Sequence, residues 1–536
     1  MSLPASEREP LPISPRILAA LRLLLATVSA LMVVLFVYTA LRRLHYAFEY
    51  DWIEDGMLAS VRHIRAGLPL YSAPGTAFTP YLYTPIYLYL AAAFSRVMGL
   101  GYAPLRLLSL LSTLGCFAVI YALVFRELRR HLAALAAVGL FAASYPVVQG
   151  AFDLGRVDML YLFFVLLAFY VTRFGNPALA ALLWVLAFQT KQGVLPIALL
   201  ALCYDWQRPR RVLLGLGSFI AILAASILWL NHASGGWYRY YVFQTAGGFG
   251  WSRVQAAHFL TADLLGACGI AVLVIVAAWL AAPIATITTR TRMRSRPFSF
   301  YALGSLGMIA FTAYLRAHRG ANVNSLLPMY AWIAVLFGLA LARLFPALET
   351  QDSPASRAAV ALLLLAASVQ LLVHLYSPGE FLPTPPERAE REAFEQQLRD
   401  IPGPVLVLSH PEDAVLAGKP LYAGSESIGA VIDARDLTRG QDLIAQYAAL
   451  LHSGTLSAVV LDITGEQTLA LRTGGHRIWM PEDFLSLYPL RIRAIGGGDS
   501  RFTSEPRWIY LPCSQQALAQ RMDTLVDTAP CHRPMP

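Results

Sequence analysis

Three carboxylates lie close together in the segment 51–55, which contains Asp51, Glu54 and Asp55. A carboxylate held beside a substrate hydroxyl can act as a general base and take its proton as the hydroxyl attacks. The alternative is a structural role, because acidic side chains are favoured in the first turn of a helix. Capping explains one acid more easily than three, so the segment predicts a site of acid–base chemistry.

Two further clusters place charges near the ends of apolar runs. In the segment 153–158, Arg156 lies between two aspartates, one of which is Asp158. Lys191 and Gln192 interrupt a run that is otherwise apolar. The first cluster is either a functional loop or a plain ion pair. The lysine either snorkels to the lipid headgroups or, between two half-helices, faces a wet cavity.

A fourth cluster is mainly basic. The segment 316–324 contains Arg316, His318 and Arg319, followed by Asn322. Arginine binds phosphate oxygens through paired, charge-assisted hydrogen bonds. These cations therefore suit either a phosphate-bearing substrate or the headgroups of membrane lipids.

Acids and cations on one face suit transfer from a donor that is activated by phosphate. A carboxylate would act as the base towards an acceptor hydroxyl, and the cations would stabilise charge on the departing phosphate. The chain has neither the GxGxxG nor the GxxxxGK[ST] pattern of a nucleotide-binding loop. That absence fits a donor carried on a lipid.

The composition indicates that a membrane surrounds the elements that position these residues. The 536-residue chain is 57% hydrophobic and only 14% charged, and its mean hydropathy is +0.53. Soluble proteins contain about 25% charged residues, so a soluble enzyme, a disordered protein and a disulfide scaffold are excluded. The five cysteines show no spacing typical of a zinc site.

Apolar runs long enough for membrane helices recur along the first 376 residues. We divide the run 178–206 into two half-helices at Lys191, which predicts about eleven transmembrane helices with a cytoplasmic N-terminus and an extracytoplasmic C-terminus. The runs are 17–41, 104–125, 132–149, 157–173, 178–206, 211–230, 262–283, 298–315, 324–345 and 357–376.

Arginines support this orientation, because cytoplasmic loops are enriched in basic residues. They also account for most of the net charge of +9, so membrane lipids are expected as partners and nucleic acid is not. The arginines of the predicted inner loops are Arg126, Arg129, Arg130, Arg173, Arg208, Arg210, Arg211, Arg290, Arg292, Arg294 and Arg296.

The first outer loop, residues 44–103, is predicted to contain two interfacial segments. In the first, 53–66, Ile53, Met57 and Val61 form an apolar stripe at helical spacing. Such an amphipathic helix is expected to lie in the membrane interface. The second, 81–89, is rich in tyrosines that suit the headgroup region.

A composition shift divides the chain into a membrane domain, 1–376, and a small extracytoplasmic α/β domain, 377–536. Cys513 and Cys531 of the second domain either pair in an oxidising compartment or remain free thiols. The elements predicted there are strands at 404–408 and 458–461 and helices near 388–398 and 441–452.

These landmarks resemble the GT-C superfamily of membrane glycosyltransferases over most of residues 15–345. Within it they look most like the bacterial family-39-like and galacturonosyltransferase-like proteins, relatives of aminoarabinose transferases and protein O-mannosyltransferases. The motifs that carry the likeness are Asp51-x-x-Glu54-Asp55-Gly56, the segments 65–71 and 83–87, Gly155-Arg156-Val157-Asp158, Thr190-Lys191-Gln192, and Arg319-Gly320 with Asn322 or Asn324.

The resemblance implies a polytopic α-helical fold in the bacterial inner membrane, with juxtamembrane helices in the first outer loop. It implies transfer of a sugar from a polyprenyl-phosphate donor, with inversion, to an envelope glycan, lipid or protein. Glu54 or Asp55 would be the general base, with Asp51 as the runner-up. The first loop of these proteins usually reads Asp-Glu or Glu-Gly, so the order found here leaves the choice open.

The same resemblance suggests roles for the other polar residues. Asp158 would orient the acceptor or, with Glu54, bind a divalent cation such as Mg²⁺ or Mn²⁺. A lipid or solute transporter is the alternative function, because transporters also contain broken helices and charges within the membrane. The candidate ligands for the donor phosphate and substrate are Arg156, Lys191, Gln192, His318, Arg319, Asn322 and Tyr83.

Overall fold

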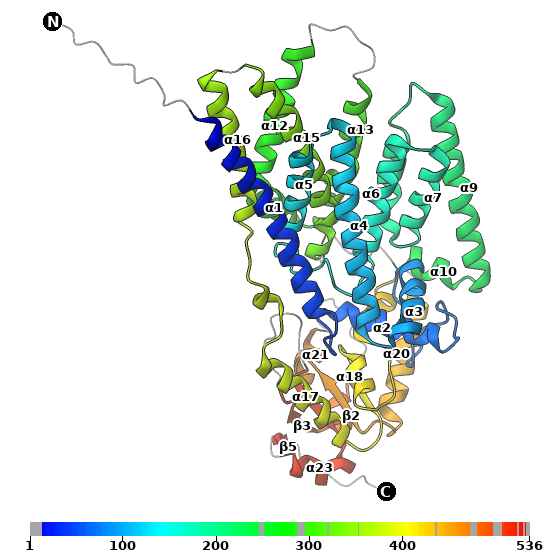
Figure 1. Cartoon of the computed structure of the whole chain (residues 1–536). Coiled ribbons are helices and arrows are strands. Elements are labelled where there is room, and N and C mark those ends of the chain that lie inside the picture. Colours follow the sequence, from blue (N-terminus) through cyan, green and yellow to red (C-terminus); the bar gives the residue numbers. More distant parts are fainter. Residues whose placement is uncertain are drawn as a thin grey trace, which may run out of the picture.

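The computed structural model describes residues 13–245, 251–286, 295–318, 321–351, 353–434, 437–471, 480–496, 506–522, 525–528 and 531. A bundle of helices forms one end of the molecule, and a smaller part built around a β-sheet, residues 377–531, forms the other (Figure 1). We call this smaller part the terminal part, and the end of the bundle that it contacts the domain end. The first turn of the N-terminal helix lies at the opposite end of the bundle.

Among the described residues, six helices are long and apolar enough to cross a membrane. Each apolar run predicted from the sequence contains a helix, whereas the count of eleven crossings stays a prediction. The bundle consists of α1 (Pro15–Arg43), α4 (Tyr102–Leu128), α5 (His131–Ala143), α6 (Asp158–Phe174), α7 (Pro177–Phe188), η1 (Gln192–Val194), α8 (Leu195–Leu202), α9 (Pro209–Ala233), α11 (Arg253–His258), η3 (Phe259–Gly266), α12 (Ala267–Thr286), α13 (Ser295–Ser305), η4 (Leu306–Ala310), α14 (Phe311–Arg316), η5 (Val323–Leu326), α15 (Leu327–Glu349) and α16 (Pro354–Leu372).

The predicted break at Lys191 is confirmed. Helix α7 ends at Phe188, and Lys191 has an extended backbone before the short turn η1 and helix α8. The backbone N–H of Ile86 donates to the free carbonyl of Gln189 at 3.0 Å. The interruption is therefore stabilised from the first outer loop.

Small residues allow the central helices of the bundle to pack closely. A Cβ atom added at Gly338 in α15 would lie 2.8 Å from the Cβ of Ala137 in α5. A Cβ atom added at Gly139 in α5 would lie 2.7 Å from the Cα of Ser29 in α1. Contacts this short leave no room for a methyl group. Helices α1, α5 and α15 therefore form a tightly packed core within the bundle.

The terminal part is a mixed five-stranded sheet in the order β1-β2-β4-β3-β5. Strands β1 (Val405–Val407) and β2 (Ala458–Leu461) are parallel, as a crossover through helices allows, and the other pairs are antiparallel. The predictions of β1, β2, α17 and α20 are confirmed, whereas β3–β5 were not predicted. The remaining elements are η6 (Pro378–Phe381), α17 (Pro385–Asp400), α18 (Pro411–Leu416), α19 (Ser425–Ile432), α20 (Leu437–His452), α21 (Gly465–Leu471), α22 (Phe484–Leu487), β3 (Leu490–Arg493), β4 (Trp508–Leu511), η8 (Cys513–Gln515), α23 (Gln516–Arg521) and β5 (Leu525–Thr528).

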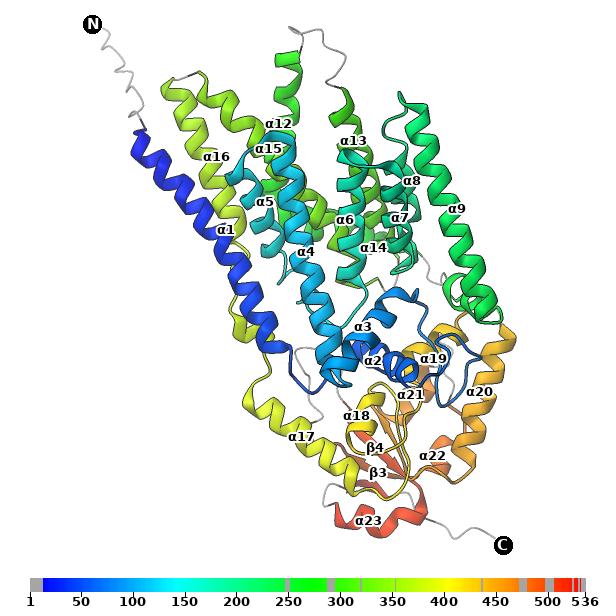
Figure 2. The ribbon, with the colours of Figure 1, turned by 45° about the vertical axis from the view of Figure 1, so that its right-hand side comes forward.

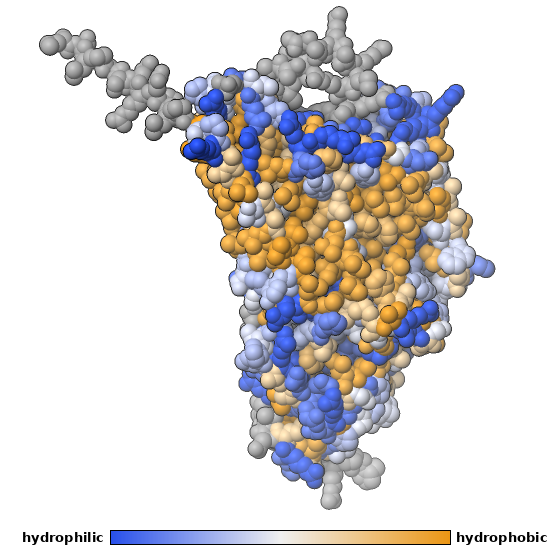
Figure 3. Space-filling view, in the orientation of Figure 1, coloured by the Kyte–Doolittle hydropathy of each residue, from blue (hydrophilic) through white to orange (hydrophobic). Residues whose placement is uncertain are grey.

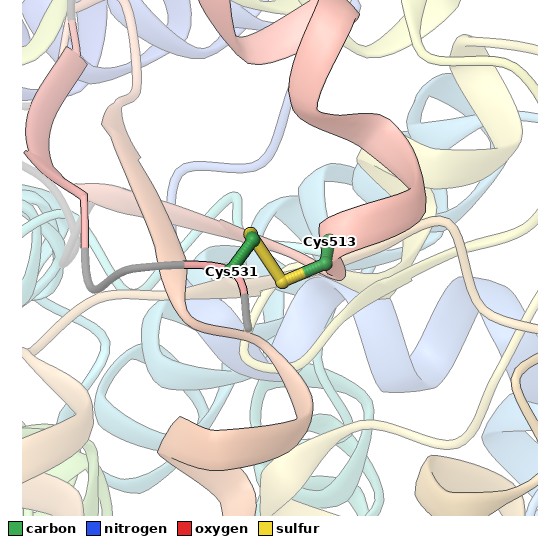
Figure 4. The surroundings of a disulfide bond; sticks show 2 residues. All are labelled: Cys513 and Cys531. Carbon is green, nitrogen blue, oxygen red and sulfur yellow. A yellow bond between two sulfur atoms is a disulfide. The ribbon is translucent and has the colours of Figure 1, made fainter. Parts of the chain in front are cut away.

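A disulfide joins Cys513 to Cys531 and decides between the two alternatives left by the sequence (Figure 4). It closes a loop that contains α23 and β5. Cys116, Cys203 and Cys268 are free.

The first outer loop lies between the bundle and the sheet, where it forms α2 (Trp52–Arg65) and α3 (Ile86–Met98) (Figure 2). The helix expected at 53–66 is confirmed, but its expected contact with lipid is wrong. Ile53, Met57 and Val61 are buried in one cluster with α3, α4 and the terminal part. The amphipathic pattern reflects packing against protein, because the terminal part covers α2 from the side away from the bundle.

The bundle surface matches a membrane environment. On the face shown in Figure 3, an apolar band crosses the bundle between two more polar ends. Arg126, Arg173 and Arg211 belong to the ends or starts of helices at the end opposite to the terminal part. Of the basic loop 290–296, residues 290–294 lie outside the described residues.

We expect the domain end to face away from the cytoplasm, because these arginines would hold the opposite end on the cytoplasmic side. Alkaline phosphatase fused to the C-terminus should then be active in cells, and the same enzyme fused between Phe174 and Pro177 should be inactive. Green fluorescent protein at the two positions should give the opposite pattern. An active phosphatase at the second position would contradict the orientation.

Candidate active site

Asp51 starts α2 and faces a cation. Its Oδ1 accepts a hydrogen bond from the backbone N–H of Ile53 at 2.9 Å, and its Oδ2 lies 2.9 Å from Nη1 of Arg156. The Asp51 side chain remains 13% exposed, whereas Glu54 and Asp55 are fully buried. Burial raises the pKa of Asp51 above its ordinary value, although Arg156 opposes this shift.

Asp158, the first residue of α6, accepts hydrogen bonds from Lys191 and Asn324 and forms an ion pair with Arg156. Lys191 Nζ lies 2.6 Å and Asn324 Nδ2 2.9 Å from its Oδ1, and Arg156 Nε lies 3.2 Å from its Oδ2. The predicted clusters at 153–158, at the helix break and at 316–324 therefore meet at this carboxylate. The sequence placed them on one side of the membrane, and the structure brings them into contact.

A cavity of about 320 Å³ opens beside Asp51 and Arg156. Sites for small molecules have volumes from about 300 Å³ upwards. Asn322 and Asn324 from the segment before α15 line it, as does Arg43 from the end of α1. With Gln149 and Glu380, the cavity is bordered by two carboxylates, two guanidinium groups and three amides.

Glu54 has a different environment. Nε and Nη2 of Arg106 lie 3.0 and 2.7 Å from its two oxygens, and the backbone N–H groups of Tyr50 and Gly155 donate to them at 2.8 and 2.5 Å. A side chain at Gly155 would lie 2.9 Å from Leu105, so glycine permits this approach. Although burial opposes it, Arg106 lowers the pKa of Glu54.

Asp55 points towards the terminal part. The hydroxyl of Tyr102 donates to its Oδ1, and the backbone N–H of Glu412 donates to its Oδ2 at 3.2 Å. Burial and the neighbouring carboxylates of Glu49 and Asp413 raise the pKa of Asp55 well above its ordinary value. Asp55 therefore lies at the contact between the first outer loop and the terminal part.

Arg43 and Tyr50 complete the wall behind Asp51. Nη1 of Arg43 lies 2.9 Å from Oδ1 of Asp153 and 2.5 Å from the hydroxyl of Tyr145. The ring of Tyr50 lies under two guanidinium groups, 4.1 Å from Arg43 and 4.5 Å from Arg106. These cation–π contacts fix the backbone that leads to Asp51.

Gln192 and Tyr83 lie at the edge of the Asp158 cluster. Gln192 Nε2 donates to the carbonyl of Leu82 at 3.0 Å. The hydroxyl of Tyr83 is within electrostatic range of Arg156 and Lys191, and its ring stacks against Tyr81. Both predicted residues are therefore close to the cluster.

The residues of the basic segment 316–324 do not all lie at the cavity. Nδ1 of His318 is 2.8 Å from the carbonyl of Tyr314, whereas Arg319 lies outside the described residues. Asn322 accepts from the backbone N–H of Val323 and also lines the cavity. Arg316, included with these cations in the sequence, instead pairs with Asp263 at 2.9 Å and donates to a backbone carbonyl.

The divalent cation suggested for Asp158 and Glu54 stays a prediction. Arg156, Lys191 and Asn324 surround the first carboxylate, and Arg106 neutralises the second. A cation would have to displace these partners. The described group that could hold a metal is a different one, formed by Glu49, Asp55 and His410.

Sequence reasoning missed Arg43, Arg106, Glu49 and the residues of the terminal part that face the first outer loop. Arg106 could have been found from the sequence, because it lies in an apolar run. A charged residue inside an apolar helix needs a buried partner or a polar cavity. His410 had no such signal, since its partners are remote in the sequence.

Comparisons with known proteins concern the family and the fold of the chain. Residues 81–315 match the sequence model of glycosyltransferase family 87, while no curated protein matches by sequence. ArnT from Cupriavidus metallidurans, solved with undecaprenyl phosphate, has a similar fold with a TM-score of 0.56 and 14% identity over 90% of this chain and 97% of ArnT. Its apo structure gives a TM-score of 0.56 and 14% identity over 89% of this chain and 97% of ArnT.

The archaeal oligosaccharyltransferase AglB from Archaeoglobus fulgidus, in complex with an inhibitory peptide and a dolichol-phosphate, has a TM-score of 0.49 and 13% identity over 90% of this chain and 74% of AglB. The family match favours the transferase over the transporter alternative. The closer likeness to family 39 stays a prediction, since the matching family is family 87. The family match over residues 81–315 thus indicates a glycosyltransferase, and the chain shares its fold with ArnT.

Proposed function

We propose that the chain transfers a sugar from a polyprenyl-phosphate donor to an extracytoplasmic acceptor, with Asp51 as the general base. The observation that carries this proposal is the position of Asp51 on the cavity wall, paired with Arg156 and next to the cluster at Asp158. Glu54 and Asp55 are buried in contacts that hold the loop in place. A polyprenyl-phosphate donor is further supported by ArnT, which was solved with undecaprenyl phosphate.

The reaction would proceed by a single displacement. The acceptor oxygen attacks the anomeric carbon as Asp51 takes the hydroxyl proton, and the bond from that carbon to the phosphate oxygen breaks. The lipid phosphate leaves with the bonding electrons, and Lys191 and Arg156 stabilise its charge. One displacement inverts the anomeric configuration. Asp158 is a positioning residue, because it contacts Arg156, Lys191 and Asn324.

The acceptor is expected among the glycans, lipids or proteins of the cell envelope. This assignment follows from the proposed orientation, in which the domain end and its cavity face away from the cytoplasm of a bacterial inner membrane. The donor lipid would reach the cavity from the bilayer.

Replacing Asp51 with asparagine should lower kcat about 10²–10⁴-fold, as expected for loss of a general base. Asparagine is also a good N-cap, so the thermal midpoint of the purified protein should change little. Sugar transfer in membranes and thermal unfolding in detergent measure the two quantities.

The matched control is Glu54→Gln, which leaves the buried Arg106 without its charge partner. It should mainly lower the thermal midpoint, because an unpaired buried charge destabilises a fold. Full turnover in Asp51→Asn, together with lost turnover and an unchanged midpoint in Glu54→Gln, would reverse the two roles.

The pH profile offers an independent check of the base. Asp51 must be ionised to accept a proton, so kcat/KM should fall as the pH drops through its pKa. Burial raises that pKa above 3.8, and the acid limb should therefore lie above this value. A residual activity of Asp51→Asn that keeps the same limb would assign it to another group.

Lys191 is one of two lysines in the chain, and Lys419 provides the control. Lys191→Gln should lower kcat about 10²-fold, because the departing phosphate loses a fixed positive charge. Lys419 lies in the terminal part, where its Nζ donates to the carbonyl of Ile401, so Lys419→Gln should keep full turnover. Equal losses in both variants would remove Lys191 from the proposed mechanism.

A further inference from the structure

A second cluster of buried charge lies where the first outer loop meets the terminal part. Glu49 and Asp55 come from the loop and from α2, and His410 precedes α18. Their nearest ligand atoms, two carboxylate oxygens and a ring nitrogen, all lie within 4.8 Å of one another. All three side chains are buried. The cluster is therefore a compact group of metal-binding atoms, formed by segments about 360 residues apart.

The surroundings of His410 resemble those of a metal-bound histidine. Its Nε2 lies 3.2 Å from Oδ2 of Asp462, and its Nδ1 lies 2.7 Å from Oε1 of Glu49. A histidine that donates one N–H to a carboxylate presents a lone pair on its other nitrogen. That lone pair would face the Glu49 oxygen, and either a second ring proton or a bound cation accommodates the contact between the two atoms. Metal-ligating histidines commonly have this carboxylate behind them.

Carboxyl groups outnumber cationic side chains around the cluster. Arg391 Nη2 lies 3.1 Å from Oε1 of Glu49 and 2.9 Å from Oδ1 of Asp413. The second oxygen of Asp413 is buried and has no hydrogen-bond partner among the described residues. Buried charges are normally paired or bound to metal. One arginine and one histidine here face four carboxylates, those of Glu49, Asp55, Asp413 and Asp462.

Neighbouring groups hold the two loop carboxylates in position. Tyr102 donates to Asp55, and its hydroxyl lies 3.5 Å from Oε2 of Glu49. The backbone N–H of Glu412 donates to the other oxygen of Asp55 at 3.2 Å. Hydrogen bonds of this kind orient metal ligands and are part of a built site.

We propose that Glu49, Asp55 and His410 bind a divalent transition metal, for which the donor set of one imidazole and two carboxylates favours zinc. Zinc holds such ligands at about 2.0–2.2 Å in a tetrahedron, so their atoms lie roughly 3.4 Å apart. Small side-chain adjustments reach this spacing, and a water completes the coordination. The metal joins the first outer loop to the terminal part and does not depend on the proposed reaction.

The direct test uses the full-length wild-type protein, purified in detergent through a tag that needs no metal resin. Elemental analysis should find about one zinc per chain, as a single tetrahedral site requires. Removal of the metal by a chelator should lower the thermal midpoint, and added Zn²⁺ should restore it, whereas Mg²⁺ should not. X-ray absorption at the zinc edge should show nitrogen and oxygen ligands without sulfur.

Two histidines of the terminal part form a matched pair of variants. His410→Ala should remove the bound zinc, whereas His452→Ala should retain it, because His452 is half-exposed and pairs only with Asp483 among the described acids. Asp462→Ala should weaken zinc binding about 10–100-fold, as expected for a residue that orients a ligand.

The proposal is overturned if wild-type protein contains no metal, takes up no Zn²⁺ and shows no metal-dependent midpoint. Zinc that remains equally in His410→Ala would lie elsewhere and would overturn it as well. If His410→Ala does not fold, the wild-type measurements and Glu49→Gln, which keeps a similar side-chain volume, decide the question.

Discussion

The ion pair between Glu54 and Arg106 supports the remainder of the domain end. Arg106 projects from α4 and also donates to the carbonyls of Arg43, Tyr46 and Phe48, so it fixes the chain that links α1 to α2. Glu54 in turn accepts from the backbone of Gly155, next to Arg156. One buried pair thereby sets the positions of both Asp51 and Arg156. Removing one partner of such a pair typically costs about 3–5 kcal/mol.

Much of this arrangement could be predicted from the sequence, because its signals are local. Apolar runs predicted the helices, and the interruption at Lys191 predicted the break between α7 and α8. The polar clusters were also correctly placed at one end of the bundle, since helices that alternate in direction return every second connection to the same side. The individual roles of Asp51, Glu54 and Asp55 did not follow, because Arg106 and Glu412 are remote in the sequence.

The terminal part shows the same limit. Strands β1 and β2 are short apolar runs, whereas in β3 the arginines Arg491 and Arg493 alternate with Leu490 and Ile492. Such a strand is recognised only once its partner in the sheet is known. The stripe of α2 was assigned to lipid for a related reason. An apolar helix face indicates that the face is buried. Its periodicity does not distinguish burial in a bilayer from burial against a protein domain.

The burial of α2 between the bundle and the sheet has a consequence for the order of assembly during biosynthesis. Glu49, Asp55 and the stripe of α2 emerge from the ribosome long before residues 391–462, which supply their contacts. Until the last quarter of the polypeptide has been translated and translocated, these acids lack their contacts with Arg391, His410 and Glu412. The chain must insert its helices first and complete its first loop last, so a truncated product would reach the membrane with an immature site.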